Sequence, residues 1–347
     1  MKLLLPGEWA LQSAMLLVWP KQGGDWGNHL TAARATLERA AYSIALHQPL
    51  LLVAPDREAL DDIHARESLS RLSRLQVMQV NADDIWARDF GPLTLFVGAQ
   101  RHFVDCRFNG WKKKYPAQLD DRVTAALCAK QSLGEGRYRR REYVLEGGAV
   151  DSNGAGCLLT TRRCLIHNAR NKGDTERKWN MVFREEFGIL RVHWLDHGYL
   201  EGDDTDGHVD TIARFVGPDA ICYQGCDDRS DPQFEDFANL EQQLAQLRDL
   251  NNRPYTLHRL PMPRAQLDED GRRLPAGYAN FLIANRVVLV PQYLDPTPDA
   301  HARRVLASIF PDREILGIDC RPLIQQNGAI HCAAMHIPAL PDPEATS

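Results

Sequence analysis

The 347-residue sequence lacks the features that mark several large classes of protein. It has no apolar run near the roughly 20 residues that a membrane-spanning helix needs. Its opening, MKLLLPGEWA, is interrupted by Pro6 and Glu8 before it reaches the length of a secretory signal core. Eight cysteines are scattered along the chain without the dense spacing of a disulfide framework. We therefore expect a soluble, cytoplasmic protein with reduced thiols.

Strong positive charge and the common nucleotide motifs are also missing. A net charge of -5 argues against a sequence-independent nucleic-acid binder, which needs a broad cationic surface, and fits a small cationic ligand better. The sequence contains no Gly-x-Gly-x-x-Gly, no phosphate loop ending in Gly-Lys and no His-Glu-x-x-His. Cys222 and Cys226 form a lone C-x3-C without a second pair, so we expect no zinc site there.

A helix followed at once by an apolar strand recurs five times and is the strongest sign of organisation. The helical stretches are 29–47, 117–130, 175–187, 232–247 and 297–309, followed by strands at 50–53, 143–145, 191–195, 255–260 and 314–318. Paired strand candidates lie between helices at 93–97 with 102–108, 209–216 with 220–223, and 281–284 with 287–290. Each unit reads strand, strand, helix, strand. Because one unit alone leaves its apolar face open, we predict a single α/β domain over 1–347, closed with pseudo-fivefold symmetry.

Four polar segments follow the strands that close these units. They are Trp86-Ala87-Arg88-Asp89, Glu146-Gly147-Gly148, the acidic stretch from Glu201 to Asp210, and Asn327 to Cys332. In a pseudo-symmetric ring, equivalent positions converge on the axis. We therefore expect a functional site where these segments meet.

Each segment alone also has a plain structural interpretation. His208 and Asp210 on a strand would share one face, which is often solvated surface. Gly202 and Gly207 bracket a sharply bent acidic loop, which favours a functional interpretation. Cys332 lies in an apolar run, where a buried structural thiol is the commoner outcome. The segments at 88–92 and 146–148 are also compatible with simple turns.

Taken together, the segments are far more specific. Asp84 to Pro92, Glu146 to Gly148, Gly207 to Asp210 and Ile330 to Cys332 resemble, in order and spacing, the agmatine deiminase and bacterial peptidylarginine deiminase family. The segments 6–10 and 278–281 are also similar to that family, so the resemblance spans nearly the whole chain. It implies the five-bladed α/β propeller of guanidine-modifying enzymes, in agreement with the five repeated units.

The resemblance assigns roles only to matching positions. Cys332 matches the nucleophile, His208 the general acid and base, and Asp89 and Asp210 the carboxylates that hold a guanidinium. Acidic and aromatic positions that would contact substrate are matched by Glu146, Asp204 and Trp86. Two departures concern the distal half of the substrate: Gln325-Gln326-Asn327-Gly328 replaces a glycine run, and Asp206 replaces an Asn.

The resemblance implies hydrolysis of a small cationic guanidine, most simply agmatine, to N-carbamoylputrescine and ammonia, a reaction of polyamine biosynthesis that leads toward putrescine. Attack by a cysteine thiolate with proton transfer by histidine needs no metal and no organic cofactor. Two alternatives stay open. The substrate could be arginine or peptidyl-arginine, with Arg88 or Arg214 pairing the carboxylate, or the chain could be an inactive, cation-binding propeller. The sequence allows a homo-oligomer and predicts no partner in nucleic acid or membrane.

Overall fold

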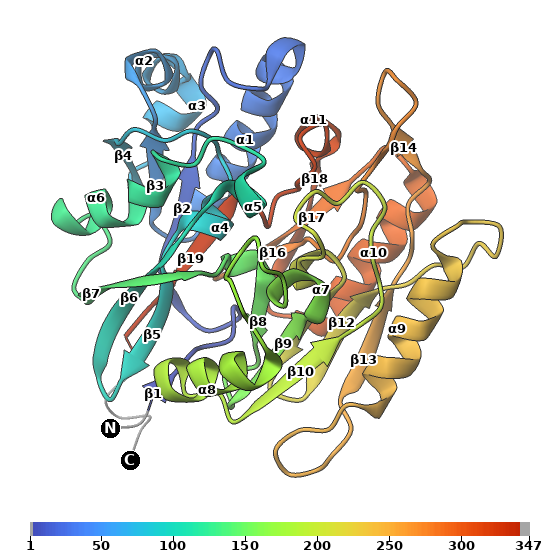
Figure 1. The fold of residues 1–347 in the computed structure, drawn as a ribbon. Helices are drawn as coiled ribbons and strands as arrows, with labels where there is room; N and C mark the ends of the chain where they lie inside the picture. The colour runs from blue at the N-terminus through green and yellow to red at the C-terminus, as the bar shows by residue number, and fades with distance from the viewer. Residues whose placement is uncertain (1–2, 341–347) are drawn as a thin grey trace.

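Five small sheets with a shared strand order make up most of the fold in a computed structural model, which describes residues 3–340 (Figure 1). The strands of the five sheets are β19 (Ala334–Pro338), β2 (Gln12–Val18), β3 (Leu50–Ala54) and β4 (Leu75–Gln79); β1 (Leu3–Leu4), β5 (Leu93–Val97), β6 (Gln100–Arg107) and β7 (Arg137–Val144); β8 (Val150–Ser152), β9 (Cys157–Thr161) and β10 (Arg191–Leu195); β11 (Ala213–Gly217), β12 (Ala220–Gln224) and β13 (Thr256–Leu260); and β16 (Leu282–Ile283), β17 (Val287–Gln292) and β18 (Glu314–Asp319). A separate hairpin joins β14 (Gln266–Leu267) to β15 (Arg273–Leu274).

One antiparallel pair and one parallel pair recur in every sheet. The antiparallel pairs are β19 with β2, β5 with β6, β8 with β9, β11 with β12, and β16 with β17. The second strand of each pair then lies parallel to β3, β7, β10, β13 or β18. A parallel pair needs a crossover connection, which a helix supplies here. The predicted repeat of strand, strand, helix, strand is confirmed.

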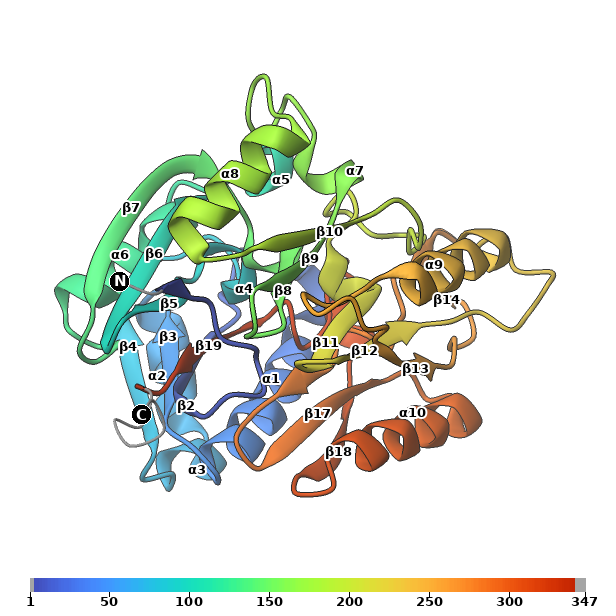
Figure 2. The ribbon, with the colours of Figure 1, turned by 90° about the horizontal axis from the view of Figure 1, so that it is seen from below.

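The crossover helices are α1 (Leu30–Ala45), α6 (Val123–Ala129), α8 (Glu176–Phe187), α9 (Phe234–Gln246) and α10 (Pro296–Ile309). Figure 2 shows α8, α9 and α10 on the outside of their sheets. The shorter helices are α2 (Arg57–Ala65), α3 (Glu67–Ser70), α4 (Ala87–Phe90), α5 (Gly110–Lys113), α7 (Arg162–Leu165) and α11 (Arg321–Ile324), with 3-10 turns η1 (Gly27–His29), η2 (Asp120–Arg122), η3 (Gly147–Ala149) and η4 (Val209–Thr211). Across residues 3–340, no helix has both the length and the apolar character needed to cross a membrane.

Local sequence signals set several of these boundaries. The side chain of Thr175 accepts a hydrogen bond from the backbone N–H of Lys178 and caps α8. Gly188 ends the same helix at φ 73°, a left-handed conformation that glycine adopts without steric cost. The pairing of β19 with β2 brings the last and first strands of the repeat into one sheet.

Several predicted boundaries are wrong. The helix predicted over 117–130 begins only at Val123, after the 3-10 turn Asp120–Arg122. The segment 209–216 is not one strand, because Val209–Thr211 forms a 3-10 turn and β11 begins only at Ala213. The strand predicted at 143–145 is the end of the longer β7, whose charged residues are tolerated because β7 is a half-exposed edge strand. Helices α9 and α10 begin at Phe234 and Pro296, one or two residues from their predicted starts.

Candidate active site

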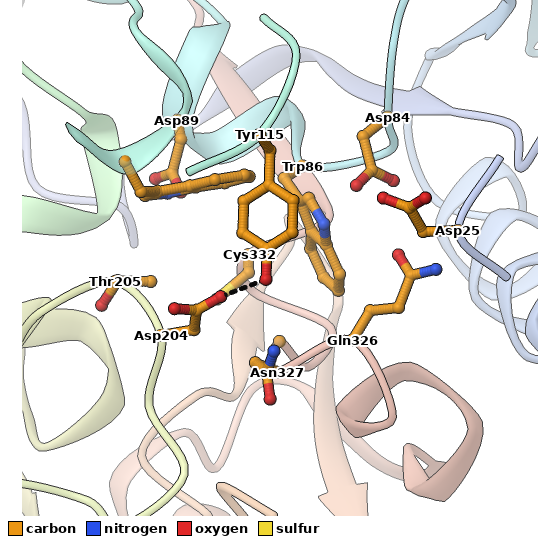
Figure 3. Close-up of a pocket in the computed structure, with 12 residues that line it drawn as sticks. Asp25, Asp84, Trp86, Asp89, Tyr115, Asp204, Thr205, Gln326, Asn327 and Cys332 are labelled. Atoms are coloured by element: carbon orange, nitrogen blue, oxygen red, sulfur yellow. Dashed lines mark hydrogen bonds between the residues drawn. The ribbon is translucent and has the colours of Figure 1, made fainter. Parts of the chain in front are cut away.

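A pocket with about 490 Å³ of empty space lies where loops after β2, β4, β6, β10 and β18 meet (Figure 3). Its lining residues are Asp25, Asp84, Trp86, Asp89, Trp111, Tyr115, Asp204, Thr205, Gln326, Asn327, Gly328 and Cys332. The polar segments that follow closing strands therefore do converge, as the repeat pattern predicts. Among the sequence candidates, Trp86, Asp89, Asp204 and Cys332 line this pocket.

Cys332 lies at the inner end of the pocket and is 4 % exposed. Its Sγ receives a hydrogen bond from Nδ2 of Asn280 at 3.2 Å and lies 3.7 Å from Oδ2 of Asp210. Burial, with the negative charges of Asp210 and Asp89, raises the pKa of Cys332 well above its usual range. The resting thiol is therefore protonated.

His208 and Asp89 form a fully buried pair beside this thiol, with Nδ1 of His208 3.6 Å from Oδ1 of Asp89. Burial alone would lower the pKa of His208, but the charge of Asp89 and the neighbouring Cys164 and Glu146 raise it to about 10. Burial and the charges of Asp210 and Glu146 raise the pKa of Asp89 to about 6. At neutral pH, the imidazole is therefore cationic and the carboxylate anionic.

The second glycine of Glu146-Gly147-Gly148 is required by this packing. A Cβ on Gly148 would lie 2.6 Å from Nδ1 of His208 and 2.9 Å from Oδ1 of Asp89, closer than real contacts allow. Its backbone N–H also donates a 3.0 Å hydrogen bond to Asp89. The motif predicted as part of the site is therefore a backbone element that brings the imidazole and carboxylate together.

Glu146 itself does not face the pocket. Its side chain is fully buried, and both carboxylate oxygens accept hydrogen bonds from Nε of Arg170, at 2.9 and 3.1 Å. The same guanidinium donates to the backbone oxygens of Cys164 and Thr205. This placement differs from the expected contact of Glu146 with substrate, because the carboxylate is occupied by Arg170.

Asp210 is held from behind by a chain of buried charged groups. His331 bridges two carboxylates: its Nδ1 is 2.6 Å from Oδ2 of Asp210 and its Nε2 is 2.7 Å from Oε2 of Glu8. Although burial opposes it, the His331 contact lowers the pKa of Asp210. The other oxygen of Asp210, Oδ1, has no hydrogen-bond partner within residues 3–340. This oxygen is available to a ligand.

Arg88 and Arg214 lie behind the pocket and not in it. Both pair with Glu8, at 3.1 and 2.9 Å, and Arg214 also pairs with Asp151 at 2.6 Å. The prediction that they could bind a substrate carboxylate is wrong, because both guanidinium groups are buried and committed to these carboxylates. They instead hold the Glu8–His331–Asp210 chain in place.

A strap, residues 109–116, covers one side of the pocket. Trp111, Lys112 and Lys113 have φ of 49°, 70° and 66°, a run of left-handed residues that costs conformational energy. Trp111 donates from Nε1 to Oδ2 of Asp89 at 2.9 Å. Figure 3 shows Tyr115 hanging across the pocket to hydrogen-bond Asp204.

Two lysines of the strap pair with the acidic loop opposite. Lys114 lies 2.8 Å from Asp204 and 3.1 Å from Asp206, and Lys112 lies 3.0 Å from Asp206. Although burial opposes it, these lysines lower the pKa of Asp206. The carboxylate of Asp206 thus supplies a charge that holds the strap.

The outer end of the pocket is acidic. Figure 3 shows Asp25 and Asp84 facing each other, away from Asp204, with Gln326 nearby. Burial, with the charge of Asp25, raises the pKa of Asp84 to about 6. None of the twelve lining residues, all within the described part of the chain, is Lys or Arg. Asn327 takes the left-handed conformation, φ 65°, which glycine adopts without steric cost.

A model of the Porphyromonas-type peptidyl-arginine deiminase family matches residues 4–338. The chain belongs to this family. The agmatine deiminase of Stutzerimonas stutzeri is 32 % identical over 359 residues, covering 96 % of this chain and 95 % of the relative. The α/β fold is the one found in solved structures of such proteins.

Two of those structures match this deiminase-family chain closely. A Porphyromonas gingivalis protein, provisionally named an arginine deiminase, is 42 % identical with a TM-score of 0.89, covering 97 % of this chain and 98 % of its own. A variant of the C. jejuni agmatine deiminase with substrate bound is 27 % identical with a TM-score of 0.90, covering 98 % and 97 %.

Several site residues of this family member were not assigned a role from the sequence. They are Glu8, Asp25, Asp84, Trp111, Tyr115, Cys164, Arg170, Asn280 and His331. Glu8 and Asn280 belong to segments that resemble the family, and that resemblance was the indication in the sequence that they lie near the site. Trp111 and Tyr115 lie in a stretch that reads only as a surface loop. Cys164, Glu146 and His208 have ligand atoms within 4.8 Å of one another, a grouping that sequence separation hides.

Proposed function

We propose that this protein hydrolyses a small guanidine, agmatine, by covalent catalysis at Cys332. One observation carries the proposal: Cys332 and Asp89 line the inner end of one pocket, and the carboxylate of Asp210 and the imidazole of His208 lie 3.7 Å from the thiol and 3.6 Å from Asp89, respectively. A module that only binds a cation needs the carboxylates but has no use for the thiol. Relatives named agmatine deiminase support the same assignment.

The two carboxylates hold the plane of the guanidinium. A guanidinium is a flat cation with N–H groups along its edges, a shape that carboxylates bind with paired, charge-assisted hydrogen bonds. Asp89 lines the pocket, and Oδ1 of Asp210 is free to accept a further bond. A guanidinium held between them lies against Cys332, with its central carbon presented to Sγ.

Cys332 becomes a nucleophile when the substrate binds. Asp89 and Asp210 oppose a thiolate in the empty pocket, and a guanidinium between them offsets their charge. The thiol then loses its proton to solvent. The thiolate attacks the guanidinium carbon and forms a tetrahedral adduct.

His208 supplies the proton for the leaving group. Its raised pKa keeps it protonated at neutral pH, so it can donate to the departing nitrogen, which leaves as ammonia. The remaining amidine carbon stays on Cys332 as a thiouronium. Neutral His208 then takes a proton from water, which attacks that carbon and releases the ureido product and the thiol. Agmatine and water thus give N-carbamoylputrescine and ammonia.

The outer end of the pocket favours a substrate with a second positive charge. Asp25 and Asp84 face each other there, and no cation of the lining competes with a distal ammonium. Burial, with the nearby charge of Asp25, raises the pKa of Asp84, so a cation bound beside these two carboxylates is favoured. Agmatine, with a guanidinium and an ammonium at opposite ends of a flexible chain, matches this pattern.

Arginine is the second candidate because one arginine lies at the rim. Nη1 of Arg272 donates to Oδ1 of Asn327 at 3.2 Å and its Nε pairs with Asp268 at 2.9 Å. A substrate carboxylate would have to draw Arg272 away from both partners. The name of the Porphyromonas gingivalis relative fits this alternative.

We also infer that the five sheets close into one five-bladed propeller and unfold as a single domain. The pairing of β19 with β2, and the ring-like arrangement of the sheets in Figure 2, support this inference. Thermal unfolding followed by near-UV and far-UV circular dichroism should give one shared transition. Two separate transitions would contradict a single domain.

The function is tested by ammonia release from agmatine, arginine and a blocked arginyl peptide, with wild type and Cys332→Ala. We expect release from agmatine, lost in the variant. Release from arginine or the peptide in preference to agmatine would overturn the substrate assignment but keep the chemistry. Ammonia release that survives in Cys332→Ala would overturn the nucleophile.

A further inference from the structure

Cys164 is a buried thiol that the proposed reaction does not use. It lies in α7, is fully buried, and its backbone N–H donates to the side chain of Thr161, which caps that helix. Its Sγ, a ring nitrogen of His208 and a carboxylate oxygen of Glu146 all lie within 4.8 Å of one another. A thiol, an imidazole and a carboxylate therefore meet at one point, and the imidazole is the group that transfers protons in the proposed reaction.

The chemistry of this group fits a thiophilic divalent cation. Thiolate, imidazole and carboxylate are the three protein ligands of zinc, and three of them leave a fourth position for water. Zinc–ligand bonds of about 2.0–2.3 Å put the atoms of a tetrahedral shell roughly 3.3–3.8 Å apart. The three groups then have to converge by about 1.5 Å at most, which rotation of buried side chains can supply.

His208 provides the second, independent observation. Both ring nitrogens are buried, and neither has a hydrogen-bond partner within residues 3–340. Leaving a buried polar group unpaired costs free energy. One nitrogen is accounted for by proton transfer to substrate, and the other can take a metal.

The surrounding charges also suit a cation. Glu146 and Asp89 contribute negative charge, and a thiolate at Cys164 would add another. Arg170 opposes them, but it bonds Glu146 through its Nε only, so each carboxylate oxygen keeps a lone pair for a metal. A divalent ion together with Arg170 balances the three negative groups.

We propose that Glu146, Cys164 and His208 form an inhibitory binding site for a zinc-class divalent cation. Binding displaces a proton from the Cys164 thiol and one of the two ring protons of His208. The metal-bound imidazole keeps its other N–H but is a far weaker acid than the imidazolium, so it does not protonate the departing nitrogen, and the enzyme stops until the ion is removed. The inhibition rests on the proposed function, whereas the binding itself does not.

Cobalt(II) tests the binding without any activity assay, because thiolate coordination to cobalt produces a strong near-ultraviolet charge-transfer band. The titration uses Cys332→Ala, so that the thiol in the pocket cannot contribute. We expect a band that saturates at one equivalent, is lost in Cys332→Ala/Cys164→Ser, and is kept in Cys332→Ala/Cys157→Ser. Cys157 is the matched control, since it is equally buried on the neighbouring β9 and lies outside the cluster.

The absence of a band in Cys332→Ala, or a band unchanged by Cys164→Ser, overturns the proposal. Cys164→Ala serves where the serine variant does not give a folded protein by circular dichroism. With wild type, zinc should inhibit ammonia release, and adding a chelator should restore it. The Cys164→Ser variant should need at least about tenfold more zinc for half-inhibition. Equal inhibition of both proteins overturns the inhibitory role. If no guanidine is hydrolysed, the function fails, and the cobalt titration still decides the metal site.

Discussion

The floor of the pocket is lined by Cys332 and Asp89, with His208 and Asp210 buried directly behind them, and these four residues are at most 4 % exposed, whereas the mouth is open to solvent. Asp25 at the mouth is exposed, and the other mouth residues, Asp84, Asp204, Gln326 and Asn327, are half-buried. The floor is fixed by hydrogen bonds that reach into the core. The mouth is held by surface ion pairs and a strained strap.

This difference separates chemistry from selectivity. A carboxylate oriented by buried charges keeps its geometry before the substrate arrives, which is what bond making requires. A carboxylate in a solvated mouth adds affinity for one end of the substrate and can change without disturbing the reaction. Variants of the floor should therefore reduce kcat strongly, and variants of the mouth should act mainly through KM.

Among the carboxylates of the pocket, the largest effect is expected for Asp210→Asn. An amide keeps the shape of the side chain but removes the charge that binds the guanidinium, so kcat/KM for agmatine should fall by about 10²–10³-fold. Steady-state ammonia release measures it. The control is Asp61→Asn, which removes an exposed carboxylate paired with Arg57 on α2 and should change nothing. A loss of less than fivefold in Asp210→Asn would mean that this carboxylate does not hold the substrate.

Low pH should weaken guanidinium binding at the floor, because it removes the charge of Asp89 as the Asp210→Asn substitution removes that of Asp210. The pKa of Asp89 is raised to about 6, so below pH 6 the carboxylate gains a proton and loses its charge. The slope of log kcat/KM against pH should therefore steepen below about pH 6, with about one additional tenfold loss per pH unit. The residual activity of Asp89→Asn should lack this break. A break that persists in the variant would assign the titration to another group.

At the mouth, Asp84→Asn should raise KM for agmatine by about tenfold while kcat changes less than twofold.

The Asp84→Asn variant should also be slightly more stable than wild type above pH 6. Because the folded state raises the pKa of Asp84, folding favours its protonated form, and stability falls as pH rises from the usual carboxyl range through about 6. An uncharged Asn avoids that loss. Thermal melts of both proteins at pH 5 and pH 8 measure the difference in stability. An equal change in Tm at both pH values would contradict this explanation.

The smallest effect is expected for the strap. Lys114→Gln removes the ion pairs to Asp204 and Asp206 and should raise KM by about threefold, as should high salt with the wild type. Lys113→Gln is the matched control, since Lys113 lies in the same strap and forms no ion pair with any residue in 3–340. If both variants behave alike, the strap does not depend on these pairs.

The sequence predicts the floor better than the mouth for physical reasons. Cys332, His208, Asp89 and Asp210 belong to short motifs, each placed after a strand that closes a repeated unit. Even there the predicted local structure was wrong, since Asp210 lies in a 3-10 turn that begins directly after His208, and the two residues do not share one strand face. The repeat period indicates which segments converge, but not the backbone conformation at the point of convergence.

Contacts between distant residues are harder to predict. Glu8 and His331 are 323 positions apart, and no periodicity connects them. The strap depends on three successive left-handed residues, two of them lysines, which no propensity favours. Lys114 and Asp204 pair only because the loops after β6 and β10 end at the same pocket. These features follow from how the five sheets are arranged, and only the structure gives that arrangement.

The most direct test of the central claim is to trap the covalent intermediate. Wild type mixed with agmatine, quenched with acid within one turnover and digested, should give the peptide containing Cys332 with the mass of the amidine-bearing diamine fragment added to its sulfur. The adduct should be absent from Cys332→Ala and from samples without agmatine. An adduct on another cysteine, or full turnover of agmatine with no adduct at any quench time, would contradict covalent catalysis at Cys332.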